Sequence, residues 1–521
     1  MFCPAVNRRR FARFVDLRKF VRFGLGLAMS GLAMGELKAR DVLVQDTTQL
    51  ASALKGARPG DVISMKSGDW KDVQIATTKG GEPGQPVVLR AELPGQVTLS
   101  GSSRLEINAP YVTIDGLLFQ HGAISSGAVI QFNSHHGLVA NTAIVDYNPA
   151  AFETNYYWVF FQGDNNVVDR CYFKGKANLE PLIGNALDGS RHNAVVHSYF
   201  KDIPYRDGNG REDIRVWGSG KMETRDDDGA YFLIQGNLFD HADGEGTEII
   251  SLKSNFNQVI ENTILATRGC LNIRRGNHNT VAGNIILGQS IPGAEGLRMS
   301  GEHNTVRGNY VSHCGYGIRV SCGEFIDRAL TADYHPDLKE HRGAAKGSKT
   351  QVLIPTYPQV KFLTLADNVL VGNADLDLEI GSDYKKHWPG SQQVLLPEEC
   401  VFQNNRFVRP QGGVSVAGTA ADGRTPLDGF KFLPNRYVGN VLSGGTCRFV
   451  AAAGGFAARD LPVGWNEAQE LAAFKPLAPD DVGPAWIIAR RRAGDLSLEG
   501  PAPADLASAS VSEQKHKARK K

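Results

Sequence analysis

His278-Asn-Thr-Val-Ala-Gly-Asn284 is one of three near-copies of a seven-residue phrase; the others are Phe256-Asn-Gln-Val-Ile-Glu-Asn262 and His303-Asn-Thr-Val-Arg-Gly-Asn309. Each copy combines a short strand with turns rich in Asn and Gly, and a repeat of this length is typical of a solenoid. Asparagine in such turns favours hydrogen-bonded ladders between coils and tolerates left-handed backbone geometry. The sequence therefore predicts an all-β fold, a single-stranded, right-handed parallel β-helix.

A second set of repeated phrases carries a basic residue: Ile250-Ser-Leu-Lys253-Ser-Asn, Leu271-Asn-Ile-Arg274-Arg-Gly, Gly296-Leu-Arg298-Met-Ser-Gly and Gly317-Ile-Arg319-Val-Ser. The basic residues are 21, 24 and 21 positions apart, so with one coil per repeat they would stack at about 4.8 Å along one face. A single Lys or Arg on a strand is usually an ordinary solvated residue. Four like charges in register repel one another and need a compensating anion, either the protein's own carboxylates or a ligand. The pattern favours a polyanion bound in a groove.

The 521-residue chain has a formal net charge of +2, so there is no general attraction to nucleic acid and anion binding must be local. Residues 1–36 are predicted to be an export signal, with Arg8-Arg-Arg10 in its basic part and an apolar stretch, Phe23 to Met34, that is too short to span a bilayer. The export route stays open between the general and twin-arginine pathways. We expect a periplasmic or secreted monomer that has no membrane segment once the signal is removed.

Residues 37–490 are predicted to form one β-helix domain, because solenoids grow without forming new cores. A helix over residues 47–54 is expected to cap its N-terminal end and cover the open edge. Residues 218–228 and 323–350 interrupt the period; such insertions lie on one face of a solenoid, and we expect them to wall the groove. Residues 491–521 are predicted to be a disordered basic tail.

An oxygen-rich cluster, Asp240-His-Ala-Asp243-Gly-Glu245-Gly-Thr-Glu248, stands directly before Lys253. Such a cluster suits a hard cation such as calcium. Alternatively, its carboxylates neutralise the neighbouring basic residues. Both roles are compatible.

Three phrases together resemble polysaccharide lyase family 6, which contains alginate lyases and chondroitinase B: Asp243-Gly-Glu-Gly-Thr-Glu-Ile-Ile-Ser-Leu-Lys-Ser254, Leu271-Asn-Ile-Arg-Arg-Gly-Asn277 and Gly296-Leu-Arg-Met-Ser-Gly301. The resemblance extends upstream through Cys171-Tyr-Phe-Lys-Gly-Lys-Ala-Asn-Leu and Asn209-Gly-Arg-Glu-Asp-Ile-Arg-Val, and it covers most of the chain after the signal.

The resemblance implies β-elimination at a uronic acid, with Lys253 as the base that removes the C5 proton. It implies that Arg274 orients the substrate and assists departure of the C4 oxygen. It also implies a calcium ion, held by Asn209, Glu245 and Glu248, that neutralises the C5 carboxylate. A neutral lysine is required for this base, and positive charge nearby lowers a lysine pKa.

The chain departs from the family pattern at Gly246-Thr247, which puts two residues rather than one between Glu245 and Glu248. On a regular strand the two carboxylates would then face opposite sides, unless a bulge at Gly246 restores the alignment. The predicted calcium site depends on this point.

Further candidate residues for substrate binding are basic or aromatic and lie on the predicted strands: Arg215, Arg298, Arg319, Trp217 and Tyr316. The predicted function is a polysaccharide lyase that acts on alginate, a polymer of mannuronate and guluronate.

Two alternatives stay open: a chondroitinase B-like lyase acting on dermatan sulfate, and a β-helix that binds polyanions without cutting them. A glycoside hydrolase would need paired catalytic aspartates on neighbouring coils, and the coils with the basic residues have none. The Asp-Pro-His-Glu motif expected of a mannuronan epimerase is absent from the sequence.

Overall fold

The computed structural model describes residues 39–187, 189–218, 228–326, 357–383, 385–388, 391–418, 432–448 and 454–500. The predicted signal peptide, most of the two predicted groove walls (219–227 and 327–356) and residues 501–521 of the predicted tail lie outside the described residues. None of the helices in the described part of the chain is long and apolar enough to cross a membrane.

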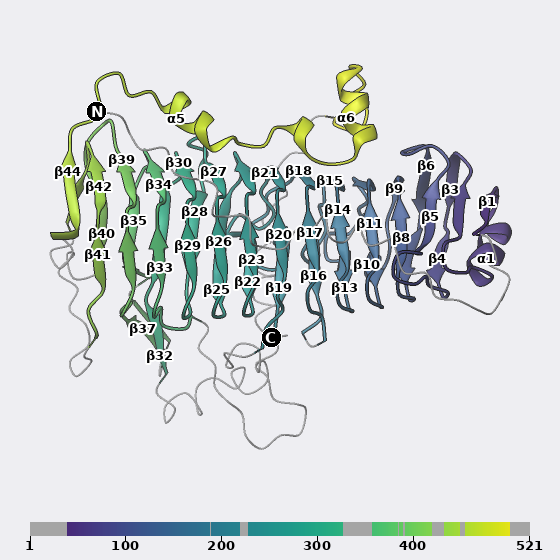
Figure 1. Ribbon diagram of the computed structural model, residues 1–521, viewed down its shortest axis with the longest axis horizontal. Helices are drawn as coiled ribbons and strands as arrows, with labels where there is room; N and C mark the ends of the chain where they lie inside the picture. Colours follow the sequence, from purple (N-terminus) through teal and green to yellow (C-terminus); the bar gives the residue numbers. More distant parts are fainter. Residues whose placement is uncertain are drawn as a thin grey trace, which may run out of the picture.

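Three long parallel sheets wind around one axis, so the fold is the predicted right-handed parallel β-helix (Figure 1). Each coil contributes one strand to sheet A, then one to sheet B, then one to sheet C. Sheet A consists of β1 (Asp41–Val44), β2 (Val62–Met65), β5 (Val87–Ala91), β8 (Val112–Asp115), β11 (Leu138–Ala140), β14 (Val167–Asp169), β17 (Ala194–Val196), β20 (Leu233–Gln235), β23 (Gln258–Ile260), β26 (Thr280–Ala282), β29 (Thr305–Arg307), β33 (Thr364–Ala366), β38 (Val401–Gln403) and β41 (Arg436–Val438).

Sheet B consists of β3 (Gly68–Lys71), β6 (Val97–Gly101), β9 (Leu117–Gly122), β12 (Ala143–Val145), β15 (Tyr172–Lys174), β18 (Tyr199–Ile203), β21 (Leu238–Ala242), β24 (Thr263–Leu265), β27 (Ile285–Leu287), β30 (Tyr310–Ser312), β34 (Val369–Val371), β39 (Arg406–Val408), β42 (Asn440–Ser443) and β44 (Phe456–Arg459). Sheet C consists of β4 (Gln74–Thr77), β7 (Arg104–Ile107), β10 (Gly127–Phe132), β13 (Tyr156–Phe161), β16 (Ile183–Asn185), β19 (Ile214–Trp217), β22 (Glu248–Lys253), β25 (Gly269–Arg275), β28 (Ala294–Met299), β31 (Tyr316–Ser321), β35 (Leu376–Ser382), β40 (Val414–Gly418) and β43 (Thr446–Cys447). A small antiparallel sheet is formed by β32 (Gly323–Ile326), β36 (Lys385–Trp388) and β37 (Ser391–Leu395).

The core fills the inside of the coils because alternate residues of each short strand are apolar. In β8, Val112 and Ile114 are buried, whereas Thr113 and Asp115 on the opposite side are partly exposed. The buried side chains form one continuous cluster from Val44 to Phe456. The outward face of each sheet is therefore free to carry polar residues.

Asparagine ladders hold successive coils together, as the sequence predicts. At the turn from sheet A to sheet B, the side-chain oxygen of each asparagine accepts hydrogen bonds from the backbone N–H and side-chain amide of the asparagine one coil earlier. This ladder runs through Asn237, Asn262, Asn284, Asn309, Asn368, Asn405 and Asn440.

The left-handed position of the repeated phrases is held by a residue other than asparagine. At the turn from sheet C to sheet A, the residue two positions before each sheet A strand has positive φ in five successive coils, and it is aromatic or histidine. These residues are Tyr231, Phe256, His278, His303 and Phe362, with φ between 49° and 61°. Their rings stack from coil to coil at 4.6–5.0 Å, which offsets the cost of the left-handed conformation.

Replacing Asn284 with Ala is expected to destabilise the protein by about 3 kcal/mol, because the fully buried N–H and amide of Asn262 both lose their acceptor. Urea unfolding, compared with the exposed Asn108→Ala as a matched control, measures this difference. The control should lie within about 0.5 kcal/mol of the natural protein. Equal midpoints for the two variants would show that the ladder contributes little stability.

The N-terminal end is covered by α1 (Thr47–Lys55), the predicted capping helix (Figure 1). The Asp46 side chain accepts a hydrogen bond from the Gln49 N–H at 2.8 Å and caps the helix. Leu50 and Leu54 are buried on the face that joins the core of the first coil.

The C-terminal segment runs back along the outside of sheet B as α5 (Glu467–Phe474), the 3-10 helix η4 (Pro479–Asp481) and α6 (Ala485–Arg492) (Figure 1). It covers two apolar patches on that sheet, and the Trp486 indole donates to the Asn141 carbonyl at 2.7 Å. The parallel coils thus end at Arg459, before the predicted boundary at residue 490. The chain remains packed beyond residue 491, where Leu498 is buried.

Candidate active site

The five predicted basic residues lie on consecutive strands of sheet C, but they do not form one column. Arg298 of β28 and Arg319 of β31 are direct partners, and their column continues through Asn272 and Ser251 to Arg215. Lys253 instead pairs with Trp217 on one side and Arg275 on the other, because the register shifts between Leu252 and Lys253. The prediction of four cations in register is therefore wrong, because Lys253 lies two residues along β22 from Ser251, the residue of that strand in the arginine column.

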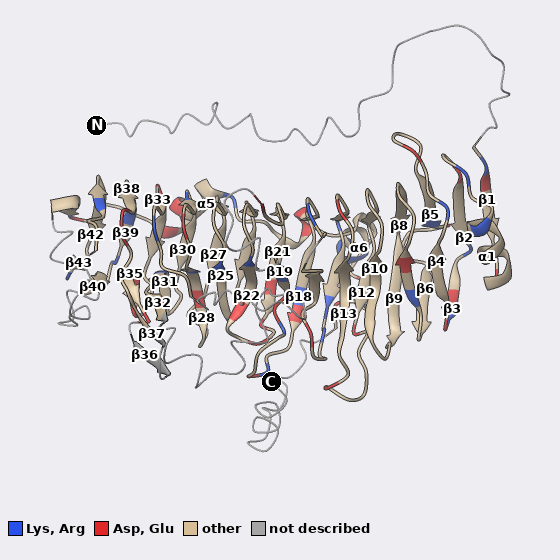
Figure 2. Cartoon of the chain, turned by 90° about the horizontal axis from the view of Figure 1, so that it is seen from below, with Lys and Arg blue, Asp and Glu red and all other residues tan. Residues whose placement is uncertain are grey.

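Each of these cations is paired with carboxylates of the protein itself. Lys253 Nζ lies 3.1 Å from Glu212 Oε1, and Arg274 Nη1 lies 3.0 Å from Glu248 Oε1. The remaining pairs are Arg215 with Glu180 and Glu212, Arg298 with Asp383, and Arg319 with Glu295, Glu379 and Asp383. Basic and acidic residues are accordingly interspersed along the coils (Figure 2). Of the two compensating anions considered from the sequence, the structure shows the protein's own carboxylates.

Three buried glutamates converge beside Lys253. Carboxylate oxygens of Glu212, Glu245 and Glu248 all lie within 4.8 Å of one another. Glu248 begins β22, whereas Glu212 and Glu245 stand in the turns that lead from sheet B into sheet C. The trio provides oxygen ligands of the kind that calcium prefers, so these residues fit a hard divalent cation.

A tight turn, rather than a regular strand, solves the spacing problem between Glu245 and Glu248. Gly244 and Gly246 both have positive φ (53° and 70°), and the Gly246 N–H donates to the Asp243 carbonyl at 2.7 Å. A Cβ at Gly246 would lie 2.3 Å from the Tyr205 ring, so only glycine fits there. The turn returns Glu245 to the same side as Glu248.

Burial and mutual repulsion govern the charge of the trio. Burial is the largest cause that raises the pKa of Glu245 to about 8, and the negative charges of Glu212 and Glu248 add to it. Two hydrogen bonds act in the opposite direction, because Glu245 Oε2 accepts from the Gly210 and Arg211 N–H groups at 2.6 and 3.1 Å. Burial also acts to raise the Glu248 pKa, but Arg274 and Lys253 together bring it below its ordinary value. One carboxyl of the group thus holds a proton near neutral pH when no cation is bound.

Asn209, the third predicted calcium ligand, stands in the loop that supplies the Gly210 and Arg211 N–H groups. Its side chain is exposed. It is close to the trio along the chain, and its role as a ligand stays a prediction.

Lys253 has the environment that a basic amine requires. Its side chain is 7% exposed and that of Glu212 is fully buried. Burial, assisted by Arg274 and Arg215, lowers the Lys253 pKa although Glu212 and Glu248 oppose this. The Trp217 indole ring covers one side, with Lys253 Nζ 4.6 Å from its centre. The uncharged form of the amine is therefore more populated at a given pH than on an ordinary surface lysine.

Arg274 and Arg298 share an aromatic neighbour that the sequence analysis did not select. Their guanidinium carbons lie 5.1 and 5.0 Å from the centre of the Tyr357 ring. Glu248 raises the pKa of Arg274 and Asp383 raises that of Arg298, each against the opposite effect of burial. Both arginines therefore remain charged at any working pH.

The other predicted binding residues are tied into the walls of the site. Arg215 Nη2 lies 3.1 Å from the Tyr157 hydroxyl, and its guanidinium carbon is 5.2 Å from the Trp217 ring centre. At the far end, Arg319 stacks against Tyr316 at 4.7 Å and is held by three carboxylates.

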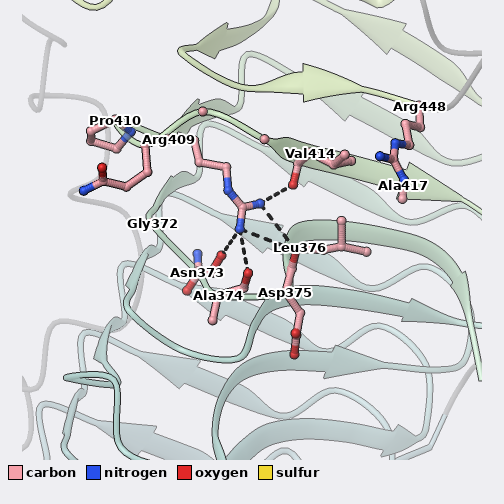
Figure 3. Close-up of a pocket in the computed structure, with 13 residues that line it drawn as sticks. Gly372, Asn373, Ala374, Asp375, Leu376, Arg409, Pro410, Val414, Ala417 and Arg448 are labelled. Atoms are coloured by element: carbon pink, nitrogen blue, oxygen red, sulfur yellow. Dashed lines mark hydrogen bonds between the residues drawn. The ribbon is translucent and has the colours of Figure 1, made fainter.

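A separate cavity of about 630 Å³ lies near the last coils, at the turns before β35 and β40 (Figure 3). The Arg409 guanidinium fills part of it and donates to the carbonyl oxygens of Asn373, Ala374, Asp375 and Val414. Because the Arg409 N–H groups donate to backbone carbonyl oxygens of both turns, Arg409 holds the two turns together. None of the lining residues belongs to β19, β22, β25, β28 or β31.

The chain is thus a right-handed β-helix protein with a charged site on the outer face of one sheet. In that site a buried lysine lies among carboxylates and an arginine. The chondroitinase B family model matches residues 44–319, more than half of the chain. The chain belongs to polysaccharide lyase family 6, as the resemblance from the sequence indicated.

Solved structures support the assignment. A family 6 polysaccharide lyase from Pseudopedobacter saltans is 37% identical, with a TM-score of 0.73 over 85% of this chain and 99% of that protein. The family 6 alginate lyase AlyGC is 25% identical, with a TM-score of 0.70, over 86% of this chain and 58% of that protein. A mannuronic acid specific family 6 lyase from human gut microbiota shares the fold at 22% identity and a TM-score of 0.70, over 89% and 100% of the two chains. No curated protein sequence gives a significant match.

Sequence reasoning missed Glu212 and Tyr357. Glu212 stands three residues after Asn209 in an irregular turn, so no strand periodicity indicates that its carboxylate faces Lys253. Tyr357 follows residues 327–356, and its separation from Arg274 along the chain hides the contact. The only available signal for Glu212 was its place in the phrase Asn209-Gly-Arg-Glu-Asp-Ile-Arg-Val, which resembles the family.

Proposed function

We propose that this protein is a lyase that cleaves alginate by β-elimination at a uronic acid. The observation that carries the proposal is the environment of Lys253: a buried amine with a lowered pKa, 3.1 Å from Glu212 and next to Arg274. An amine of this kind can remove the proton at C5, which is difficult to abstract because it lies beside a carboxylate. Glu212 holds the amine in place through its hydrogen bond.

Arg274 orients the substrate and supplies fixed positive charge where negative charge develops. Glu248 positions Arg274 by an ion pair, and the Asn272 side-chain amide donates to the same Glu248 oxygen at 2.8 Å. Trp217 contacts Lys253, and Tyr357 contacts Arg274 and Arg298. These residues bind and align the sugar without changing their charge.

Glu212, Glu245 and Glu248 are the residues that would hold calcium, with Asn209 as a further candidate. A calcium ion there would supply the positive charge that neutralises the C5 carboxylate and so makes the C5 proton more acidic. The fit rests on the three converging carboxylates.

The charge of the site favours alginate over dermatan sulfate as the substrate. Alginate carries carboxylates alone, whereas dermatan sulfate also carries sulfates, which require extra positive charge. In the described part of the groove, Arg215, Arg298 and Arg319 are already paired with carboxylates of the protein. The family 6 relative AlyGC is itself an alginate lyase. We further propose that the protein acts in the periplasm or outside the cell, where such polymers are found.

Ultraviolet absorbance during incubation with polymannuronate, polyguluronate and dermatan sulfate tests the function. Elimination leaves a conjugated double bond at the new non-reducing end, so absorbance should rise on an alginate block. A rise on dermatan sulfate alone would transfer the protein to the chondroitinase B activity. New reducing ends without absorbance would indicate hydrolysis and contradict the proposal, and binding without either signal would leave a non-catalytic polyanion-binding protein.

A further inference from the structure

The carboxylates of Glu212, Glu245 and Glu248 repel one another, yet their oxygens lie within 4.8 Å. Glu212 and Glu245 also stand outside the strands, in the turns of two adjacent coils. Their convergence therefore requires contacts that join these turns. The buried side chain of Arg211, the residue before Glu212, makes such contacts.

The Arg211 guanidinium joins the turns of three successive coils. Its Nη1 donates to the carbonyl oxygens of Pro204 and Gly244 at 3.1 and 2.7 Å. Its Nη2 donates to the Lys176 carbonyl at 3.0 Å, and Nε donates to the Asn178 carbonyl at 3.3 Å. These carbonyl oxygens follow β15, β18 and β21, at the turns from sheet B to sheet C. A guanidinium can hold all three turns because its N–H donors form a rigid planar fork.

The same residue sets Glu245 relative to Glu212. Gly244 directly precedes Glu245, so the guanidinium holds the peptide that carries this glutamate. From the backbone, the Gly210 and Arg211 N–H groups hold the Glu245 carboxylate itself. The two turns approach so closely that a Cβ at Gly244 would lie 2.4 Å from the Arg211 carbonyl oxygen. Arg211 thus fixes the turn before each of the two carboxylates.

Arg409 makes the same kind of contacts away from the trio, at the turns before β35 and β40. Arg409 is 9% exposed and Arg211 is 5% exposed, and each guanidinium donates to four backbone carbonyl oxygens. None of the three glutamates lies at the Arg409 turns. The two arginines therefore share a structural role, and Arg211 is the one of the pair that adjoins the trio.

We propose that Arg211 is a positioning residue that holds Glu212 and Glu245 in the arrangement that binds a divalent cation. The inference rests on the proposed function, in which these glutamates hold calcium. Arg211 acts through the two carboxylates and not on the substrate. Groups packed behind the ligands of a metal commonly set its affinity, because they orient the ligands before the metal binds.

Replacing Arg211 with Met tests the role, because the side chain keeps its length and loses all its donors. The dissociation constant of calcium, measured by titration calorimetry on the metal-free full chain without polysaccharide, should rise about 10- to 100-fold. Arg211→Lys keeps the positive charge but lacks the planar fork, so it should recover only part of the affinity.

Arg409→Met is the matched control, since it removes an equally buried set of donors. Its thermal midpoint without calcium should fall about as far as that of Arg211→Met, while its calcium affinity should stay natural. This comparison separates positioning of the trio from general loosening of the coils. If Arg211→Met does not fold, Arg211→Lys against Arg409→Lys carries the same comparison.

Natural calcium affinity in the folded Arg211 variants would overturn the inference. An equal loss of affinity in the Arg409 variants would also overturn it, because the effect would then be a general loss of rigidity. A natural protein that binds no calcium would overturn it as well, since the trio would not be a cation site. Failure to form unsaturated product from any polymer, with calcium binding as expected, would contradict the proposed function alone.

Discussion

Replacing Lys253 with Arg should lower kcat/KM on the cleaved polymer by about 10²- to 10⁴-fold, the contribution of a general base. Arginine keeps the positive charge opposite the buried Glu212 carboxylate, so the ion pair survives, but its guanidinium does not deprotonate at working pH. Lys253→Ala is less informative, because it leaves Glu212 buried without a partner, and breaking a buried pair costs about 3–5 kcal/mol. Initial rates from ultraviolet absorbance and the thermal midpoint are to be measured together.

Lys361→Arg is the matched control, because Lys361 also forms an ion pair, with Glu398 at 2.8 Å, away from the groove. It should keep full activity. For the natural enzyme, kcat/KM should rise with pH through the Lys253 pKa, which burial places below that of an ordinary lysine. A Lys253→Arg enzyme that folds normally and keeps more than a tenth of the activity would exclude Lys253 as the base.

Removal of calcium by a chelator should abolish most of the activity and lower the thermal midpoint, by an amount that grows with pH. Burial and the neighbouring glutamates raise the pKa of Glu245 from 4.5 to about 8. The folded, metal-free protein therefore binds more protons than the unfolded chain between these values, and its stability falls as pH rises through that range. A bound cation favours the ionised carboxylates, so stabilisation by calcium should be larger at pH 8 than at pH 5. Calcium at a concentration 100-fold above its Kd should raise the free energy of unfolding by about 2.7 kcal/mol.

The variant Glu245→Gln separates this effect from general salt effects. Its amide does not titrate, so the metal-free variant should lose less stability between pH 5 and pH 8, and calcium should raise its midpoint less. Glu82→Gln, an exposed glutamate on an early coil, should behave like the natural protein. A calcium-induced shift that is independent of pH and identical in both variants would show that the trio does not bind the ion.

The repeated phrases predicted the architecture well, because a β-helix coil is specified locally. Asn262, Asn284 and Asn309 recur at the coil spacing, and the structure places them in one ladder. Lys253 and Arg274 were also selected correctly as neighbours on adjacent strands of one sheet. Both results follow from residues that are close in sequence or one coil apart.

The register of the site was not predictable in the same way. Strand β25 is one residue longer than β22, and the register shift after Leu252 sets Lys253 opposite Arg275. Such irregularities are settled by the packing of whole coils. The turn at Gly246 is similar, since the Tyr205 ring lies so close to it that a side chain would not fit. The doubt raised by the spacing of Glu245 and Glu248 therefore needed three-dimensional contacts to resolve.

The sequence by itself determined the coil, the sheet that carries the cations and the family, and it selected Lys253, Arg274, Glu245 and Glu248 as candidates, because each is encoded by a short phrase in a repeating frame. Only the tertiary structure decided that Glu212 pairs with Lys253, that the arginines are paired with the protein's own carboxylates, and that Tyr357 contacts Arg274 and Arg298. These contacts join irregular turns to strands on other coils. They depend on the three-dimensional positions of the turns, which the periodicity of the sequence does not predict.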